Sequence, residues 1–375
     1  MNLHIVCLDV PYPPDYGGVF DLFYKIKTLY QLGVKIHLHC FEYGRGEQAE
    51  LNQYCEEVHY YEREKLVQGL PLRLPYIVSS RINPALIKNL LKDNYPVLLE
   101  GIHCTYYLYH GELNQRKVLV RLHNVEYEYY KQLARWTNNF YKKIYYTLES
   151  RLLKKYENSI AKKGKFIAVN EKDKETYQKQ FYPKDVVFLP VFLPFNKVES
   201  QIGRGNFCLY HGNLSVSENE KAARWLLKHV VKYLTNFNFI LAGKNPSEEL
   251  KKECLKNNNV QLIQNPSQQE MQDLIRNAHI HLLPSFNSTG IKIKMLNALF
   301  NGRFVITNKA SLKETGLEAL CCIEETPSGY INRINELFAI NFNENEINKR
   351  KLILENLYDN EKNGKRLMQI INREL

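Results

Sequence analysis

Short apolar segments alternate with helical patterns along the whole chain, and this alternation limits the folds that the chain can adopt. In the first half the apolar segments are residues 3–8, 35–41, 96–99, 118–122, 166–169 and 186–189. In the second half they are residues 207–210, 238–242, 260–263, 280–283 and 304–307. Strands that alternate with helices form parallel sheets with helices on both faces. The sequence therefore predicts an α/β protein with doubly wound sheets.

A length of 375 residues suggests two domains. Pro190 and Pro194 precede a polar stretch that ends at Asn206, and the two prolines block a regular element there. We expect an N-terminal Rossmann-like domain in residues 1–196 and a C-terminal one in residues 206–340. The tail, 341–375, has a charged helical pattern, and we expect its helices to pack back toward the N-terminal domain. Two such domains that face one another border a central cleft, where open α/β sheets bind ligands.

The sequence lacks the signals of membrane-spanning, secreted and disulfide-bonded proteins. No apolar run reaches the roughly 18 residues of a membrane span, and the first residues lack a basic-then-apolar secretory pattern. The 8 cysteines are dispersed without a Cys-x-x-Cys pair, which indicates reduced thiols. We therefore expect a cytoplasmic protein, which could be peripheral on the inner face of the cytoplasmic membrane.

Metal and nucleotide-cofactor motifs are also missing. His37 with His39, and His279 with His281, could share strand faces, but no carboxylate or thiol is spaced to complete a metal site, so we interpret them as histidines of the sheets. The glycine pairs at 44–46 and 203–205 do not stand between a strand and a helix, and no Gly-Lys-Ser/Thr is present. We expect no metal, nicotinamide or P-loop chemistry.

A glycine pair follows the first predicted strand. Gly17 and Gly18 end a proline-rich segment and precede an amphipathic helical pattern that stops at Gly33. Glycines at a helix start let backbone N–H groups approach an anion, which the helix dipole also favours. The alternative is an ordinary strand-to-helix turn.

Polar residues gather after two further predicted strands. Residues 118–122 lead into His123 and Glu126, and residues 96–99 lead into Glu100 and His103. An imidazole at the carboxyl end of a strand can donate to a phosphate or a sugar hydroxyl. Polar residues are common at strand ends in any case, so neither segment by itself indicates a functional site.

The segment from residue 281 to 307 carries the strongest signal. It reads as a strand, a polar loop, a glycine at a helix start, a short helix ended by Gly302, and a further strand. Thr289, Gly290 and Ile291 can present N–H groups to a diphosphate, with Lys292 as a positive charge beside it.

These segments resemble the GT-B glycosyltransferases of the large family-four type, especially bacterial members that act in surface-polysaccharide assembly. Residues 284–307 look like the donor-site signature of that family, and residues 13–18 look like its N-terminal glycine loop. Residues 209–220 are similar to the opening of its second domain, and residues 241–244 to the strand end that follows. The resemblance implies a retaining transfer of a sugar from a nucleotide-diphosphate sugar to a glycan or lipid-linked acceptor, with no further cofactor.

The resemblance also implies residue roles. It places Gly290, Ile291 and Lys292 near the diphosphate, with Lys292 as a catalytic charge, and it places His123 at the reacting sugar. Gly17 and Gly18 belong to the phosphate and acceptor side. Further donor-binding positions are Gly212, Asn213, Lys244, Thr289 and Asn297.

The chain departs from the family pattern in its paired glutamates and in its basic residues. The family has two glutamates eight positions apart, where this chain has Thr289 and Asn297. An amide can still bind ribose hydroxyls, but without charge assistance the contact weakens. The usual Arg and Lys after the first strand of the second domain are not evident, and their substitutes could be Lys221, Lys244, Lys292 or Lys294. The alternative function is therefore a catalytically silent GT-B-like binding subunit that acts through partners.

The positive charge is concentrated in one stretch. The net charge is +11, and residues 131–165 hold ten Lys or Arg against Glu149 and Glu157, which makes that stretch +8. Its apolar residues recur at helical spacing and are interleaved with tyrosines. A basic amphipathic helix of this kind can lie on an anionic membrane. The alternative is a helix packed on its own sheet with a solvated basic face. Because no nucleic-acid-binding motif accompanies the charge, we expect no nucleic-acid partner.

Overall fold

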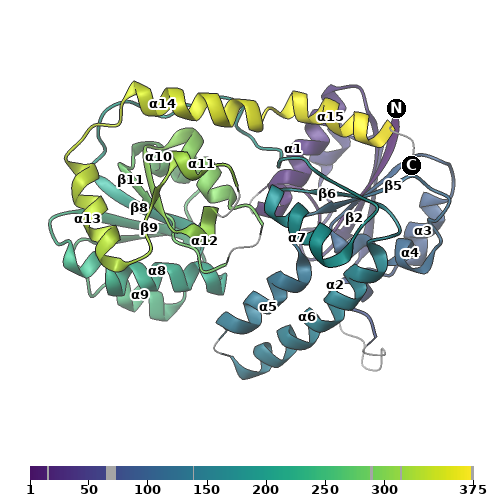
Figure 1. Cartoon of the computed structure of the whole chain (residues 1–375), viewed down its shortest axis with the longest axis horizontal. Helices are drawn as coiled ribbons and strands as arrows, with labels where there is room; N and C mark the ends of the chain where they lie inside the picture. Colours follow the sequence, from purple (N-terminus) through teal and green to yellow (C-terminus); the bar gives the residue numbers. More distant parts are fainter. Residues whose placement is uncertain (15–16, 65–72, 138, 288–289, 313–314, 373–375) are drawn as a thin grey trace. The chain divides into compact units, whose positions relative to one another are not determined.

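The computed structural model describes residues 1–14, 17–64, 73–137, 139–287, 290–312 and 315–372. The chain forms two compact units (Figure 1). Unit 1 contains residues 1–194 and 358–375, and unit 2 contains residues 195–357. Each unit is a parallel sheet with helices, as the alternating pattern predicts.

Unit 1 contains a seven-stranded parallel sheet in the order β3-β2-β1-β4-β5-β6-β7. Its strands are β1 (Asn2–Cys7), β2 (Lys35–Glu42), β3 (Glu57–Glu62), β4 (Val97–Glu100), β5 (Val118–Leu122), β6 (Lys165–Ala168) and β7 (Asp185–Phe188). Its helices are α1 (Gly17–Gln31), α2 (Tyr76–Ser79), α3 (Pro84–Leu90), α4 (Tyr106–His110), α5 (Glu126–Trp136), α6 (Phe140–Ile160), α7 (Glu171–Phe181) and α15 (Asn360–Asn372).

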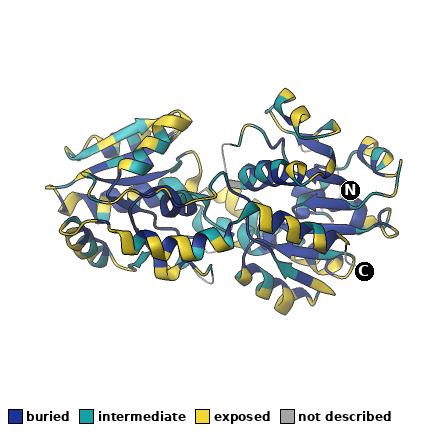
Figure 2. Ribbon diagram, turned by 90° about the horizontal axis from the view of Figure 1, so that it is seen from above, coloured by how far each residue is buried: buried dark blue, intermediate teal, exposed yellow. Residues whose placement is uncertain are grey.

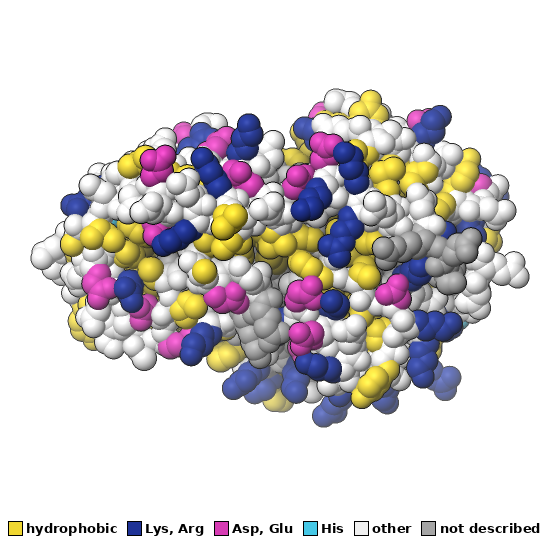
Figure 3. All heavy atoms as spheres, turned by 45° about the horizontal axis from the view of Figure 1, so that its top comes forward, with side chains coloured by type: hydrophobic (Ala, Val, Ile, Leu, Met, Phe, Trp, Pro, Cys, Tyr) yellow, Lys and Arg dark blue, Asp and Glu magenta, His cyan; other side chains and the backbone are white. Residues whose placement is uncertain are grey.

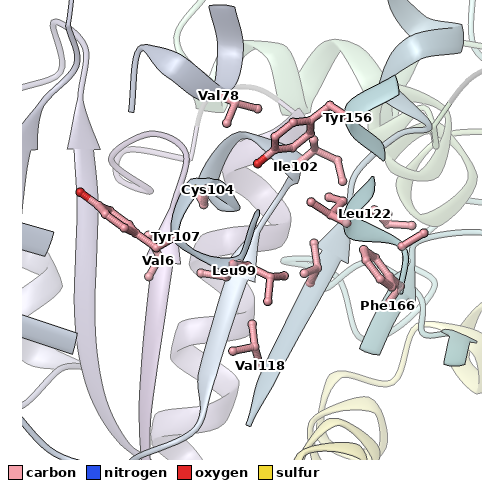
Figure 4. Packing of buried hydrophobic residues seen from close by; sticks show 14 of the residues in the cluster. Val6, Val78, Leu99, Ile102, Cys104, Tyr107, Val118, Leu122, Tyr156 and Phe166 are labelled. Carbon is pink, nitrogen blue, oxygen red and sulfur yellow. The ribbon is translucent and has the colours of Figure 1, made fainter. Parts of the chain in front are cut away.

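Two apolar cores cover the two faces of this sheet. Successive strand residues point to opposite faces, so that Leu99 and Val120 enter one core while Leu98 and Leu119 enter the other. Figure 4 shows part of the first core, where strand residues meet Tyr156 of α6. All residues of β4 and β5 are buried, as expected for central strands of a parallel sheet.

The second core is closed by α1 and α15, which come from opposite ends of the chain. Gly364 of α15 permits their close contact, because a β-carbon there would lie 2.7 Å from Leu32 Cδ1 and 2.9 Å from Thr28 Cγ2. Leu367, in α15, is buried in the same core. The C-terminal helix is therefore an integral layer of unit 1.

Unit 2 contains a six-stranded parallel sheet in the order β10-β9-β8-β11-β12-β13. The strands are β8 (Phe207–Asn213), β9 (Asn238–Lys244), β10 (Val260–Gln264), β11 (Ile280–Leu282), β12 (Phe304–Thr307) and β13 (Cys322–Ile323). The helices are α8 (Ser217–His229), α9 (Glu248–Cys254), α10 (Gln268–Asn277), α11 (Ile293–Asn301), α12 (Lys309–Leu312), α13 (Pro327–Phe338) and α14 (Glu344–Arg350), which a π-helical segment (Lys351–Glu355) continues. In each unit the buried residues lie mainly in the strands and on the inner helix faces (Figure 2).

Each of the eleven predicted strand segments overlaps a strand of the structure, and two further strands were missed. The edge strand β3 has the sequence Glu-Val-His-Tyr-Tyr-Glu and is only partly buried, so it lacks the apolar run of a central strand. The strand β13 has two residues, which is too short for a detectable pattern.

The division of the chain differs from the expected boundaries. The first break lies between Pro194 and Phe195, within the proline-containing segment, and the tail is split between Leu357 and Tyr358. The helix α14 belongs to unit 2, where the buried Arg350 donates to the carbonyl oxygens of Leu299 (3.0 Å) and Gly302 (2.6 Å). Of the helices in the tail, only α15 belongs to unit 1, so residues 341–375 are divided between the two units.

The basic stretch 131–165 forms two helices rather than one. The helix α5 ends at Trp136, and α6 begins at Phe140 with Asn139 as its N-cap, whose side chain accepts from the Lys142 N–H group at 3.0 Å. The two helices pack against each other as a hairpin. Within the described residues, no helix is both long and apolar enough to cross a membrane.

Candidate functional site

The glycine pair of unit 1 lies where the sequence predicts it. Gly17 and Gly18 are the first residues of α1, directly after the segment that follows β1. The first turn of α1 contains no acidic residue. The helix start is therefore compatible with an anion, because the helix dipole favours negative charge and the first turn itself contributes no carboxylate.

A buried ion network lies next to this helix start. Asp21 accepts two hydrogen bonds from Arg121, at 3.1 and 3.2 Å, and one from the main-chain N–H of Phe192 at 2.8 Å. Lys25 Nζ lies 2.9 Å from Asp21 Oδ2. Arg121 also donates to the main-chain carbonyls of residues 189–190 at 2.7 and 2.8 Å. Burial raises the pKa of Asp21, but Arg121 and Lys25 outweigh it and hold this pKa well below its ordinary value.

His123 contacts a second buried carboxylate of the network. His123 Nε2 lies 3.1 Å from Glu100 Oε2, and Lys25 Nζ lies 2.9 Å from Glu100 Oε1. Glu100 is the last residue of β4 and is fully buried, whereas the His123 side chain follows β5 and is 12% exposed. Parallel strands end at the same sheet edge, which explains why these two groups meet. The sequence named both residues but did not predict their contact.

This cluster is a charge-balanced network rather than an open metal site. Asp21, Glu100 and His123 form the one set in the described part of the chain whose ligand atoms lie close enough together for a metal ion. However, Lys25 and Arg121 already contact the two carboxylates and balance their charge. The residues therefore fit ion pairing and not a cation site.

The histidines of the two sheets contact neighbouring groups instead of sharing a ligand position. His37 Nδ1 lies 2.7 Å from Glu57 Oε1, and His39 Nε2 lies 2.9 Å from His4 Nδ1. His279 Nε2 lies 2.8 Å from a main-chain carbonyl oxygen at the end of α13. Among the described residues, none of these histidines is part of a three-ligand set.

The second site lies in unit 2, at the carboxyl ends of β8, β9 and β11. The ends of β8 and β9 approach each other closely, because a β-carbon at Gly243 would lie 1.9 Å from the Gly212 carbonyl oxygen. The Asn213 side chain accepts from the backbone N–H of Ser215 at 3.1 Å and thus shapes the turn before α8. Lys244, at the end of β9, is exposed beside it. Three predicted donor-binding residues are therefore neighbours.

Lys294 is the cation that the structure places deepest in this site. It lies in the first turn of α11, and its Nζ donates to Asn219 Oδ1 at 2.8 Å. The same Nζ lies 5.0 Å from the centre of the Tyr210 ring, whose hydroxyl donates to the Asn219 carbonyl at 2.6 Å. Burial lowers the pKa of Lys294 to about 8; Glu218 opposes this shift and Lys292 adds to it. The sequence analysis named Lys294 only as one of four lysines that could substitute for the family's usual Arg and Lys.

Glu218 connects Lys292 to the loop after β11. Lys292 Nζ lies 3.8 Å from Glu218 Oε1, and the Ser285 hydroxyl donates to the same oxygen at 2.6 Å. Lys292 and Lys294 thus both interact with the carboxylate of Glu218, so that two positive charges gather where β8, α8 and α11 meet. Such a cluster can bind an anionic group.

The predicted helix start at Gly290 is wrong by three residues. Gly290 has φ +62°, which is not helical, and α11 begins at Ile293 with Lys292 at its N-cap position. Gly290 and Ile291 lie in the preceding loop and are partly exposed. The N–H groups at the helix start therefore belong to the residues that follow Lys292. Thr289 lies outside the described residues.

Asn297 lies on the next turn of α11. Its side-chain oxygen accepts from Asn301 at 2.9 Å, and its amide nitrogen lies 3.4 Å from the Gln272 oxygen of α10. The residue is partly exposed. An amide chain therefore occupies the position where the resemblance implies a carboxylate.

Comparisons with known proteins identify the family. A model of the family described as glycosyl transferases group 1 matches residues 205–339. An uncharacterized 44.6 kDa protein in the cps region of Klebsiella pneumoniae is 31% identical over 331 residues, which cover 83% of this chain and 84% of that protein. The chain belongs to the group 1 glycosyltransferases.

Solved structures of similar fold cover this glycosyltransferase from end to end. WaaG, a glycosyltransferase involved in lipopolysaccharide biosynthesis, has a TM-score of 0.66 at 13% identity, with 100% of both chains covered. A glycosyltransferase from Rickettsia africae has a TM-score of 0.65 at 14% identity and covers 99% of this chain and 97% of its own. Anabaena HepE in complex with UDP and glucose has a TM-score of 0.66 at 12% identity, with 100% and 99% covered. The protein has the GT-B fold.

Proposed function

We propose that this glycosyltransferase moves a sugar from a nucleotide-diphosphate sugar to a glycan or lipid-linked acceptor in the synthesis of a bacterial surface polysaccharide. The observation that carries the proposal is the arrangement of Lys292 and Lys294 around Glu218 at the start of α11. A diphosphate is the anion that such a cluster suits. The relative in the cps region and the likeness to WaaG support the polysaccharide context.

The mechanism follows from where charge develops. Breakage of the bond between the anomeric carbon and the phosphate oxygen leaves extra negative charge on the nucleoside diphosphate. Lys294 and Lys292, with the N–H groups at the start of α11, would stabilise that charge. His123 would contact the reacting sugar, and Gly17 with Gly18 would serve the phosphate and acceptor side. This scheme requires no nucleophile from the protein.

A binding subunit without catalysis is the second candidate, because an amide at Asn297 stands in place of the family's carboxylate. The two functions differ in turnover. If the chain is an enzyme, one or more nucleotide sugars will raise its melting temperature, because a ligand that binds only the folded state stabilises it. We expect the same donors to release nucleoside diphosphate, measured by a coupled assay.

The control for this test is a preparation of Lys294→Met, which should bind and turn over the donor poorly at equal concentration. Stabilisation by a nucleotide sugar without any diphosphate release, with membrane fractions supplied as acceptor source, would support the binding subunit. The absence of both thermal stabilisation and diphosphate release with every donor would contradict both functions.

The hairpin of α5 and α6 presents a surface that suits an anionic membrane. In the first half of α6, Phe140, Tyr141, Ile144 and Leu148 are 70%, 82%, 45% and 47% exposed. In the second half, Leu153, Tyr156 and Ile160 are buried in the core. The helix is thus anchored at one end and exposes an apolar stripe at the other.

Basic side chains surround this stripe. Lysine and arginine side chains gather along the lower edge of the molecule in Figure 3, where α6 lies in Figure 1. Exposed members on α6 are Lys142, Lys143, Arg151, Lys154 and Lys155. We therefore propose that the surface formed by residues 140–155 docks on anionic lipid, which would bring the enzyme to a lipid-linked acceptor.

Vesicle sedimentation tests this docking. We expect the protein to sediment with vesicles of anionic phosphatidylglycerol and not with neutral phosphatidylcholine. Replacing both Lys142 and Lys143 with glutamine should weaken binding roughly thirtyfold, since each basic residue near the surface contributes about 1 kcal/mol. Leu148→Ser should also reduce binding, whereas Leu352→Ser, at a 71% exposed leucine of unit 2, should not. Equal binding to both vesicle types would contradict electrostatic docking.

A further inference from the structure

Glu100 uses its two carboxylate oxygens for two different partners. Lys25 Nζ lies 2.9 Å from Oε1, and His123 Nε2 lies 3.1 Å from Oε2. Lys25 and Glu100 are completely buried, so this arrangement is held by the interior of unit 1 and not by solvent. The imidazole is the member of the group that reaches the surface.

We propose that Glu100 is a positioning residue that holds His123 in the tautomer with hydrogen on Nε2, so that Nδ1 accepts a hydrogen bond from a hydroxyl group of the reacting sugar. This inference rests on the proposed function, because it assigns the ligand of His123 within that reaction. It specifies a neutral hydroxyl donor rather than a phosphate as the group that His123 contacts.

The tautomer follows from the charge on Glu100. Burial raises the pKa of this carboxyl, but Lys25 and the hydrogen bond with His123 outweigh burial and lower the pKa overall. An ionised carboxylate has no hydrogen to donate, so Nε2 must be the donor in the contact with Glu100. As long as the imidazole is uncharged, it carries this one hydrogen, and a lone pair is left on Nδ1.

The surroundings restrict the ring without replacing this contact. Gly101 has φ +86°, and a β-carbon there would lie 2.9 Å from His103 Nδ1, so the glycine makes room for the His103 ring, while the same β-carbon would be in ordinary contact with His123 Cδ2 at 3.6 Å. Asp21 and Arg121 pair with each other behind Lys25 and balance the remaining charge. Within the described part of the chain, Glu100 is the side chain to which the His123 ring is hydrogen-bonded. Glu100 therefore determines the hydrogen position on the ring.

The hydrogen position on His123 can be observed directly in the wild-type protein. In protein labelled with ¹⁵N-histidine, we expect the His123 Nε2 resonance in the range of a protonated ring nitrogen and the Nδ1 resonance in the range of an unprotonated one. The His123→Ala variant identifies the resonances by their loss. Hydrogen on Nδ1, or on both nitrogens at neutral pH, would overturn the inference.

Glu100→Gln should reverse the tautomer. The ammonium of Lys25 will draw the amide oxygen, so that the amide NH₂ group faces His123 Nε2, which must then accept. The hydrogen moves to Nδ1, and we expect kcat/KM for the donor to fall about tenfold or more, the effect of a hydrogen bond that is left unmade. Glu57→Gln is the matched control, since Glu57 contacts His37 and His59 on the same unit outside the site.

A double-mutant cycle separates positioning from general structure. If Glu100 acts through His123, Glu100→Gln will not lower kcat/KM further in the His123→Ala background. An equal loss in both backgrounds would show a structural role and would contradict the inference. The failure of the proposed function can be told apart from the failure of this inference. If no donor releases diphosphate, the proposed function fails, but the predicted ¹⁵N pattern is unaffected. If the enzyme is active but the ¹⁵N pattern is wrong, only the positioning role of Glu100 is removed.

Discussion

Replacing Lys294 with methionine is expected to lower kcat/KM for the nucleotide-sugar donor by about 100- to 1,000-fold, the loss typical of a preorganised charge in an active site. The ammonium is already held by Asn219 and by the face of Tyr210, so it needs no reorganisation when charge develops on the diphosphate. Methionine keeps the apolar stem, and the melting temperature should therefore change little. Initial rates of diphosphate release over a range of donor concentrations measure the effect.

The pH dependence of donor binding provides an independent test of Lys294. Since the pKa of Lys294 is lowered to about 8, the ammonium is lost as pH rises through that value. Donor binding in the wild type should therefore weaken above pH 8, and Lys294→Met should lack this dependence. Lys292→Ala should also reduce turnover. Lys251→Met, at a surface lysine paired with Glu248, is the control that should keep wild-type rates. Wild-type turnover in Lys294→Met would remove this residue from the site.

Replacing Asp21 with asparagine is expected to lower the free energy of unfolding of unit 1 by about 3 to 5 kcal/mol. The substitution keeps the shape of the side chain but leaves the buried Arg121 and Lys25 with one carboxylate, Glu100, between them. Such uncompensated buried charge is strongly destabilising. Urea unfolding followed by fluorescence in a Trp225→Phe background measures it, because Trp136 then reports on unit 1 alone.

The effect of Asp21 should also fade in acid. Its pKa is lowered in the folded protein, so its contribution is fully present above the unfolded value of about 4 and is lost as pH falls below that value toward the folded pKa. The difference between wild type and Asp21→Asn should shrink over this range. Glu248→Gln, at an exposed ion pair, should leave the unfolding curve unchanged. A pH-independent difference between wild type and Asp21→Asn would assign the effect to packing instead of charge.

The core strands were predictable because a parallel strand covered on both faces must be apolar throughout. The strands β4 and β5 illustrate this, since every residue in them is buried. The strand β3 was not predictable on the same basis, because an edge strand with one covered face alternates and resembles a polar loop. The break between α5 and α6 was missed for a related reason: apolar spacing continues across it, and Asn139 is a cap that only the tertiary packing selects.

The candidate site was predictable only in part. The sequence identified the loop with Gly290 and Lys292, because glycine and lysine near a helix start are a local pattern. It could not rank Lys294 above Lys292, since the partners of Lys294 are Tyr210 and Asn219, which lie 84 and 75 residues away in the chain. Periodicity carries no information on such distant contacts.

By itself, the sequence determined the two parallel sheets, the order of their strands along the chain, and the family to which the glycosyltransferase belongs. Only the tertiary structure decided which charged groups meet: Asp21 with Arg121, Glu100 with His123, and Lys294 with Asn219. The physical reason is that burial of apolar area depends on local pattern, whereas a pair of polar groups is stable inside a protein only when both arrive at the same place with matching charge and geometry.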